Sequence, residues 1–202
     1  MRTKIGLICL LLWTATASAQ RYRDDGRDRL IIGGNAGIFR VSYDGFTRVY
    51  DKRSGLTLGG TGLLKIRVPY YLAVKYRHFE KDGSVVVNNV SQPQSWKENW
   101  YTAGVRYLSY GERKVISYFG FGFAFFNIKE TGTVSVFNRD PGKKRNASGF
   151  FLDGGLEYRF SKYASLDFEI EVTSAGLEGK SGFEGSSVGG YLFSVGTKFF
   201  LF

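Results

Sequence analysis

Hydrophobic and polar residues alternate with a period of two along most of this chain. The run 189–202 is an example, because its odd positions are mostly apolar and its even positions are mostly small or polar. In the run 115–128 four phenylalanines share the odd positions, opposite glycine and alanine. A period of two places successive side chains on opposite faces of a β-strand. The pattern therefore predicts strands that each carry one apolar face and one polar or small face.

Runs of this kind recur about every 20 residues, and we predict strands near 30–43, 55–68, 70–80, 99–110, 115–128, 148–160, 164–174 and 189–202. The connections alternate in length. Tight turns are expected at 68–70, 111–114 and 161–163, and long polar loops at 44–54, 81–98, 129–147 and 175–188. Short turns at one end and long loops at the other are typical of an up-and-down antiparallel barrel with an even number of strands.

The first residues carry a different pattern. Two positive charges precede an apolar run at 5–13, and Ala17 and Ala19 provide a cleavage motif before Gln20. This order is typical of a secretory signal peptide, and the apolar run is too short for a membrane-spanning helix. We predict a signal peptide at 1–19, a flexible periplasmic leader at 20–29 and a barrel at 30–202. The single cysteine lies in the predicted signal peptide, so the mature chain has no thiol chemistry.

The charges on the polar strand faces sort by sign. Cations come from the second to fourth strands and anions from the sixth and seventh, and we predict that they form one network across the lumen: Lys65, Arg67, Lys75, Arg77, Arg106, Asp153, Glu157, Asp167, Glu169 and Glu171. Burying such charges unpaired would cost several kcal/mol each. A row of phenylalanines on a water-exposed surface would favour aggregation. We therefore expect the apolar faces outside, towards lipid. The facing of the first strand stays open, because both of its series contain apolar residues.

The strand series, the loop lengths, the predicted signal peptide and the aromatic Phe202 at the last position together resemble the small eight-stranded bacterial outer-membrane β-barrels of the OmpA/OmpX kind. The resemblance implies an all-β fold, an eight-stranded antiparallel up-and-down transmembrane β-barrel in the bacterial outer membrane. It also implies that Phe202 is part of a terminal insertion signal, and a bulge within 199–202 would place it on the apolar face. Side chains fill an eight-stranded barrel, so a general diffusion pore is not expected.

Candidate chemistry is sparse. The single histidine, His78, is expected at the rim of the third strand near Glu80 and Ser84, but three converging groups are not evident and we predict no catalytic residue. The absence of a Cys/His cluster predicts no metal site, and no cofactor is expected. Two alternatives stay open. One is a lipid-modifying outer-membrane barrel enzyme with His78 at the rim, and the other is a soluble periplasmic lipocalin-like barrel that binds an apolar ligand.

The net charge of +10 and the basic segment 138–146 suit anionic partners outside the membrane, and the alternative is that 138–146 is a solvated loop and the charge serves solubility. We expect outer-membrane lipid and lipopolysaccharide, the barrel-insertion machinery and an extracellular ligand of the loops as partners, no nucleic acid, and a monomer. Aromatic residues at two levels are expected to form interface girdles: Trp96, Trp100 and Tyr101, and Tyr70, Tyr71, Tyr110 and Tyr163. The predicted function is non-enzymatic, with a structural or surface-interaction role through four long extracellular loops.

Overall fold

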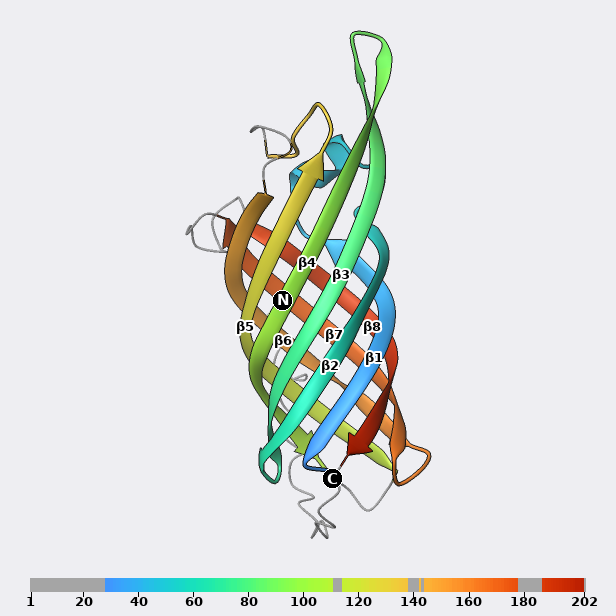
Figure 1. Cartoon of the computed structure of the whole chain (residues 1–202), viewed down its shortest axis with the longest axis vertical. Helices are drawn as coiled ribbons and strands as arrows, with labels where there is room; N and C mark the ends of the chain where they lie inside the picture. Colours follow the sequence, from blue (N-terminus) through green and yellow to red (C-terminus); the bar gives the residue numbers. More distant parts are fainter. Residues whose placement is uncertain (1–27, 111–113, 138–141, 143, 178–186, 202) are drawn as a thin grey trace, which may run out of the picture.

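The structure, a computed structural model, describes residues 28–110, 114–137, 142, 144–177 and 187–201. Eight antiparallel strands pair in chain order, and β1 pairs with β8 to close a barrel (Figure 1). The strands are β1 Leu30–Val41, β2 Ser54–Arg67, β3 Tyr70–Val87, β4 Val90–Ser109, β5 Val115–Thr131, β6 Lys144–Arg159, β7 Ala164–Leu177 and β8 Ser187–Leu201. The predicted eight-stranded up-and-down barrel is confirmed.

The β2–β3 and β6–β7 connections lie at the lower end of Figure 1, where β1 begins beside the end of β8 and Leu30 pairs with Leu201. The connections at the upper end include a short 3-10 helix, η1 Asp44–Arg48. Among the described residues, no helix is long and apolar enough to span a membrane. We refer to these two ends as the lower and upper ends of the barrel.

The segment 81–98, predicted as a loop, is instead mostly strand. Pairing between β3 and β4 runs without a break from Tyr70 opposite Tyr107 to Val87 opposite Val90. Asn88 and Asn89 connect the strands with φ angles of 52° and 60°, as a two-residue type I′ turn requires. The hairpin rises above the other strands in Figure 1. The prediction was wrong because 81–98 has no continuous apolar face, although the Asn-Asn pair between valines is a turn signal.

The apolar faces point outward and the charged faces point inward. On β5 the phenylalanines at 119, 121, 123 and 125 are 47–59% exposed, whereas eight of the ten predicted network residues are buried. The structure also settles β1, where Ile32 and Ile38 face outward and Ile31 and Phe39 are buried. A soluble barrel with an apolar interior does not fit this arrangement, so the lipocalin-like alternative is wrong.

The outward apolar band has the height that a membrane requires. On β5 it extends from Val115 to Phe125, ten residue steps of about 3.4 Å each. With the tilt of roughly 40° usual for such barrels, the band is about 26 Å tall, close to the ~25 Å apolar band of outer-membrane barrels. The apolar exterior of the strands is therefore tall enough to cross a bilayer.

Side chains fill the lumen in three layers. The upper layer is an aromatic cluster that includes Phe39, Trp96 and Trp100, together with Phe46 and Tyr50 from the η1 region. The lower layer is a smaller cluster of buried residues: Ile31, Leu63, Tyr71, Ala73, Leu108, Tyr110, Ile116, Tyr118 and Phe200. A group of buried charges around Lys75 and Arg106 lies between the two clusters, in contact with Trp100 of the upper cluster and Tyr118 of the lower one. Most residues of both clusters come from the inward faces of the strands, and the upper cluster also includes Phe46 and Tyr50 from the η1 region.

The predicted aromatic girdles are partly wrong. Tyr70, Tyr101 and Tyr163 are exposed on the outside, as expected, but Trp96, Trp100, Tyr71 and Tyr110 are buried in the lumen. The physical reason is parity: neighbours in a strand point to opposite faces, so Trp100 and Tyr101 cannot both face lipid. The same argument separates Tyr70 from Tyr71.

Candidate functional site

The lumen contains a buried charge network centred on Lys75 of β3. Its ammonium Nζ lies 2.5 Å from a carboxylate oxygen of Asp153 and 3.4 Å from one of Glu169, and it also donates to Glu171. All four side chains are fully buried. The three carboxylates lie close enough together to hold a metal ion, but Lys75 already occupies the space among them. The cluster is therefore an ion-paired core.

Two arginines extend the network. Arg106 of β4 donates from Nη2 to Asp153 at 2.5 Å and to Glu169 at 2.6 Å. Arg77 of β3 donates to Glu169 at 2.6 Å and to Asn35 of β1 at 2.5 Å. The pairs join β3 and β4 to β6 and β7 across the lumen, so the barrel walls are connected by charge-assisted hydrogen bonds.

Aromatic residues surround this network. The guanidinium of Arg106 lies 4.2 Å from the Tyr118 ring centre, and the ammonium of Lys75 lies 4.6 Å from that of Phe151. The indole N–H of Trp100 donates to Glu171 at 3.0 Å, which joins the upper aromatic cluster to the charged layer. The network is thus continuous with the packing above it.

Lys198 of β8 is a network residue that the sequence prediction missed. Its ammonium lies 2.8 Å from Asp167 and 3.3 Å from Glu157. Near the lower end, Arg159 contacts Asp28 at 2.8 Å, and Asp28 is 1% exposed, so the end of the predicted leader is docked against the barrel. The polar face of 189–202 already carried the signal for Lys198, but the prediction took cations from the second to fourth strands alone.

Two of the ten predicted network residues are not fully buried. Lys65 is half-buried near the lower end of β2, and Arg67 is exposed, so the expectation for Arg67 is wrong. The β2–β3 register shifts between Lys65 and Arg67, which breaks the alternation that would have pointed Arg67 inward. Phe202 lies outside the described residues, as do the predicted signal peptide and most of the leader. The pairing of β1 with β8 is regular through Leu201.

A second polar site lies on the outside of the barrel, above the apolar band. Lys97 of β4 is paired with Lys129 of β5, and Lys129 with Lys144 of β6. We call these three exposed residues the lysine row. Lys97 forms an ion pair with Glu80 at 2.7 Å. Among the described residues, no ion pair or hydrogen bond of Lys129 or Lys144 is present.

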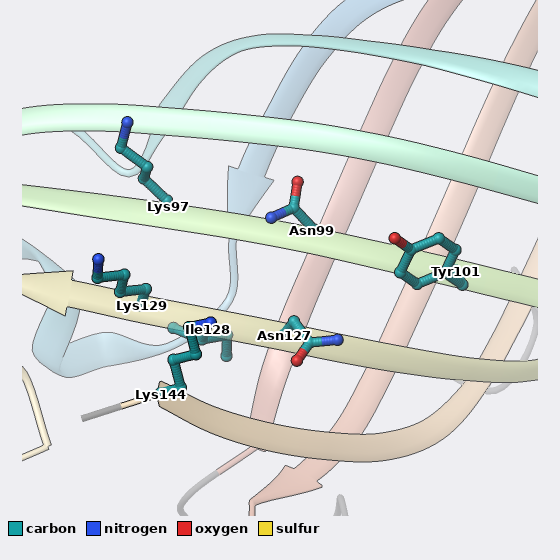
Figure 2. Close-up of a pocket in the computed structure, with 7 residues that line it drawn as sticks. All are labelled: Lys97, Asn99, Tyr101, Asn127, Ile128, Lys129 and Lys144. Carbon is teal, nitrogen blue, oxygen red and sulfur yellow. The ribbon is translucent and has the colours of Figure 1, made fainter. Parts of the chain in front are cut away.

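A row of amides lies between the lysine row and the apolar band. Asn99, Asn127 and Asn146 occupy paired positions on β4, β5 and β6, and we call them the amide row. The two rows enclose a shallow pocket of about 280 Å³, whose lining also includes Tyr101 and Ile128. Figure 2 shows the side chains of Lys97, Lys129 and Lys144 on neighbouring strands, with Asn99 and Asn127 beside them.

His78 lies in the level of the amide row on β3. Its Nδ1 is 2.8 Å from the side-chain oxygen of Asn99, and its Nε2 is 3.7 Å from a carboxylate oxygen of Glu80. Ser84 is six residues further along the same strand, which places it about 20 Å away. His78 and Glu80 therefore lie close together, whereas Ser84 is distant from both.

Comparisons with known proteins agree with the fold. No family model matches the chain, and no curated protein matches it. Among solved structures, Neisserial surface protein A aligns with a TM-score of 0.62 at 12% identity, over 85% of this chain and 97% of that one. The outer membrane protein OprG from Pseudomonas aeruginosa aligns with a TM-score of 0.56 at 14% identity, over 84% of this chain and 94% of that one.

The fold is that of the small eight-stranded transmembrane barrels of bacterial outer membranes. The resemblance to barrels of the OmpA/OmpX kind is confirmed at the level of the fold. At these identities the likeness concerns architecture, so the role of the chain has to be argued from its own residues.

Proposed function

We propose that this chain is a non-enzymatic protein of the bacterial outer membrane that acts in surface interaction through its upper end. The observation that carries the proposal is the β3–β4 hairpin, which extends beyond the rest of the barrel (Figure 1). The fold and the similarity to two solved outer-membrane barrels support a location in the outer membrane.

The packing of the lumen supports a role outside the barrel rather than transport through it. The upper aromatic cluster, the charge network and the lower cluster fill successive levels of the interior. At the lower level Tyr71 and Tyr110 are buried and joined by a hydrogen bond of 2.5 Å between their hydroxyls. A solute would have to displace paired charges and packed rings, which is costly.

The hairpin has the chemistry of a recognition element. Pairing with β2 ends at Phe79 and pairing with β5 ends at Ser95, so the described residues above these points form a two-stranded ribbon with both outer edges unpaired. At its tip Val86 and Val90 are 70% and 55% exposed. Open strand edges beside apolar side chains are suited to adding an extended segment of a partner protein.

Surface labelling tests the orientation. The mature chain is predicted to contain no cysteine, so Ser91→Cys in the hairpin and Lys162→Cys in a lower turn each introduce a unique thiol. In intact cells of a Gram-negative host, a membrane-impermeant maleimide should label Ser91→Cys, and Lys162→Cys should react after permeabilisation alone. The opposite pattern would contradict an upper end that faces the outside.

Shortening the hairpin tests the interaction itself. Residues 84–93 are replaced by Asn-Gly, which joins the paired residues Gly83 and Gln94 by a favourable turn. Cells that express the wild-type chain should attach to protein-coated surfaces or to one another more than empty-vector cells, and the shortened variant should lose this gain. Equal attachment by both variants would remove the proposal.

The enzyme alternative stays a prediction with its own test. It requires that His78→Ala abolishes a change in membrane lipid that the wild-type chain produces. Lipid profiles that do not change when the whole protein is deleted would remove it.

A further inference from the structure

We propose that the lysine row and the amide row together bind the phosphorylated headgroup of a glycolipid in the outer leaflet. The proposal deepens the proposed function, because it rests on an upper end that faces the outside of the outer membrane. It assigns to the barrel wall a lipid-binding site that is separate from the hairpin.

The lysine row places like charges in paired positions of neighbouring strands, which is unfavourable for strand pairing. Like charges directly opposite one another in neighbouring strands are destabilising, yet Lys129 lies between Lys97 and Lys144 in register. Glu80 neutralises Lys97 at one end, and the described residues offer Lys129 and Lys144 no anion. An anion from outside the chain would remove the repulsion and provide the missing partner.

The vertical order of the rows matches a phosphorylated glycolipid. Three successive outward-facing residues of β5 are the aromatic Phe125, the amide Asn127 and the cationic Lys129. Four residue steps separate Phe125 from Lys129, about 13 Å along the strand and roughly 10 Å along the barrel axis. Acyl chains would pack on the phenylalanines, sugar hydroxyls would meet the amides, and phosphate would meet the ammonium groups.

The pocket between the rows provides the space for this headgroup. It is lined by residues of both rows and by the aromatic Tyr101 (Figure 2). Tyr101 is exposed at the top of the apolar band on β4. Tyr101 pairs with Tyr76 and Phe125 on the neighbouring strands, so the lower border of the pocket is an aromatic shelf. Asparagine side chains can both donate and accept, as hydroxyl-rich sugars require.

The ligand is a membrane lipid rather than a free phosphate. The lysine row lies directly above the lipid-facing band, so a lipid beside β4–β6 brings its headgroup to the row without a separate binding event. Lysines near an anionic membrane surface each strengthen attraction by about a factor of 5. Removing the charges of Lys129 and Lys144 should therefore weaken the interaction about 30-fold.

The test uses the refolded mature chain in nanodiscs of phosphatidylcholine that contain a minor share of bisphosphorylated lipid A. The partition of lipid A between the annulus of the barrel and the bulk lipid is measured by mass spectrometry of co-purified lipid. Lys129→Gln/Lys144→Gln is compared with Lys52→Gln/Lys162→Gln, which removes the same charge from other exposed positions. Lys129→Arg/Lys144→Arg keeps the charge and should keep the enrichment.

We expect enrichment of lipid A around the wild type and the control, and loss of most of it in the Lys129→Gln/Lys144→Gln variant. Dephosphorylated lipid A and phosphatidylglycerol should show little enrichment, which distinguishes a phosphorylated sugar headgroup from simple negative charge. Inorganic phosphate at millimolar concentration should not compete. Equal enrichment in the variant and the wild type, equal enrichment of phosphatidylglycerol, or displacement by free phosphate would each overturn the proposal.

This result is independent of the hairpin. The shortened-hairpin variant keeps both rows and should enrich lipid A like the wild type, and the Lys129→Gln/Lys144→Gln variant should still attach to surfaces. Failure of the lipid experiment therefore leaves surface interaction in place, and failure of the attachment experiment leaves the lipid site in place.

Discussion

The two faces of strands β3–β6 carry the same kinds of charge in opposite situations. Inside, Lys75 is fully buried and lies among three carboxylates from the facing strands. Outside, Lys129 is exposed between two further lysines. The inner cation completes a network within the chain, whereas the outer cation lacks a described partner. The comparison shows that the face of the strand, rather than the residue type, decides whether a lysine stabilises the fold or is available to a ligand.

Arg106→Leu should give the largest effect, because it breaks the inner network. It leaves Asp153 and Glu169 without two short hydrogen bonds in a fully buried position. Removing one member of such a buried pair costs about 3–5 kcal/mol. The measurement is the free energy of unfolding in urea, with the barrel in lipid vesicles. Arg67→Leu is the matched control and should be nearly neutral, since Arg67 is exposed; equal effects would show that burial does not separate the two arginines.

Glu98 is a buried acidic residue for which the described residues provide no cationic partner. It is 0% exposed, and its Oε2 accepts a hydrogen bond of 2.9 Å from the Trp96 indole. It lies above the apolar band, between Lys97 of the lysine row and Asn99 of the amide row. Burial raises the pKa of Glu98 to about 8, because the charged form loses its hydration, and the Trp96 hydrogen bond offsets part of this.

The sign of the resulting pH dependence follows from linkage. The unfolded chain releases this proton near pH 4.5 and the folded barrel keeps it to about pH 8, so stability falls as pH rises between these values. Glu98→Gln should match the wild type at pH 4 and exceed it in free energy of unfolding at pH 9. Glu80→Gln, on the outer face, should keep the loss at high pH; an identical slope in wild type and Glu98→Gln would contradict the assignment.

Lys129→Glu should give the smallest change in stability. Unlike Arg106→Leu, it should stabilise the barrel. It converts the repulsive row into alternating charges with Lys97 and Lys144 on either side. Opposite charges in paired positions stabilise a sheet by at most about 1 kcal/mol, so the unfolding midpoint should rise slightly. If lipid A enrichment falls while stability rises, the outer lysines serve a ligand rather than the fold. A drop in stability would instead show that the row contributes to folding.

Local rules predicted much of this protein. The alternation of residues located all eight strands, and the sorting of charge by sign predicted that Lys75, Arg77 and Arg106 would face Asp153 and Glu169. The same rules failed where the alternation is interrupted. Arg67 follows a register shift, and 81–98 is polar on both faces, so neither its strand character nor its length above the membrane could be read from periodicity.

The sequence by itself determined the class of fold and the separation of apolar and charged faces, because a period of two is a property of each strand alone. Only the tertiary structure decided which strands face one another and in which register. Register brought Lys198 beside Asp167 and Glu157, and it aligned Lys97, Lys129 and Lys144 in one row on three strands. Such alignments depend on hydrogen bonds between residues distant in the chain, and no local pattern contains that information.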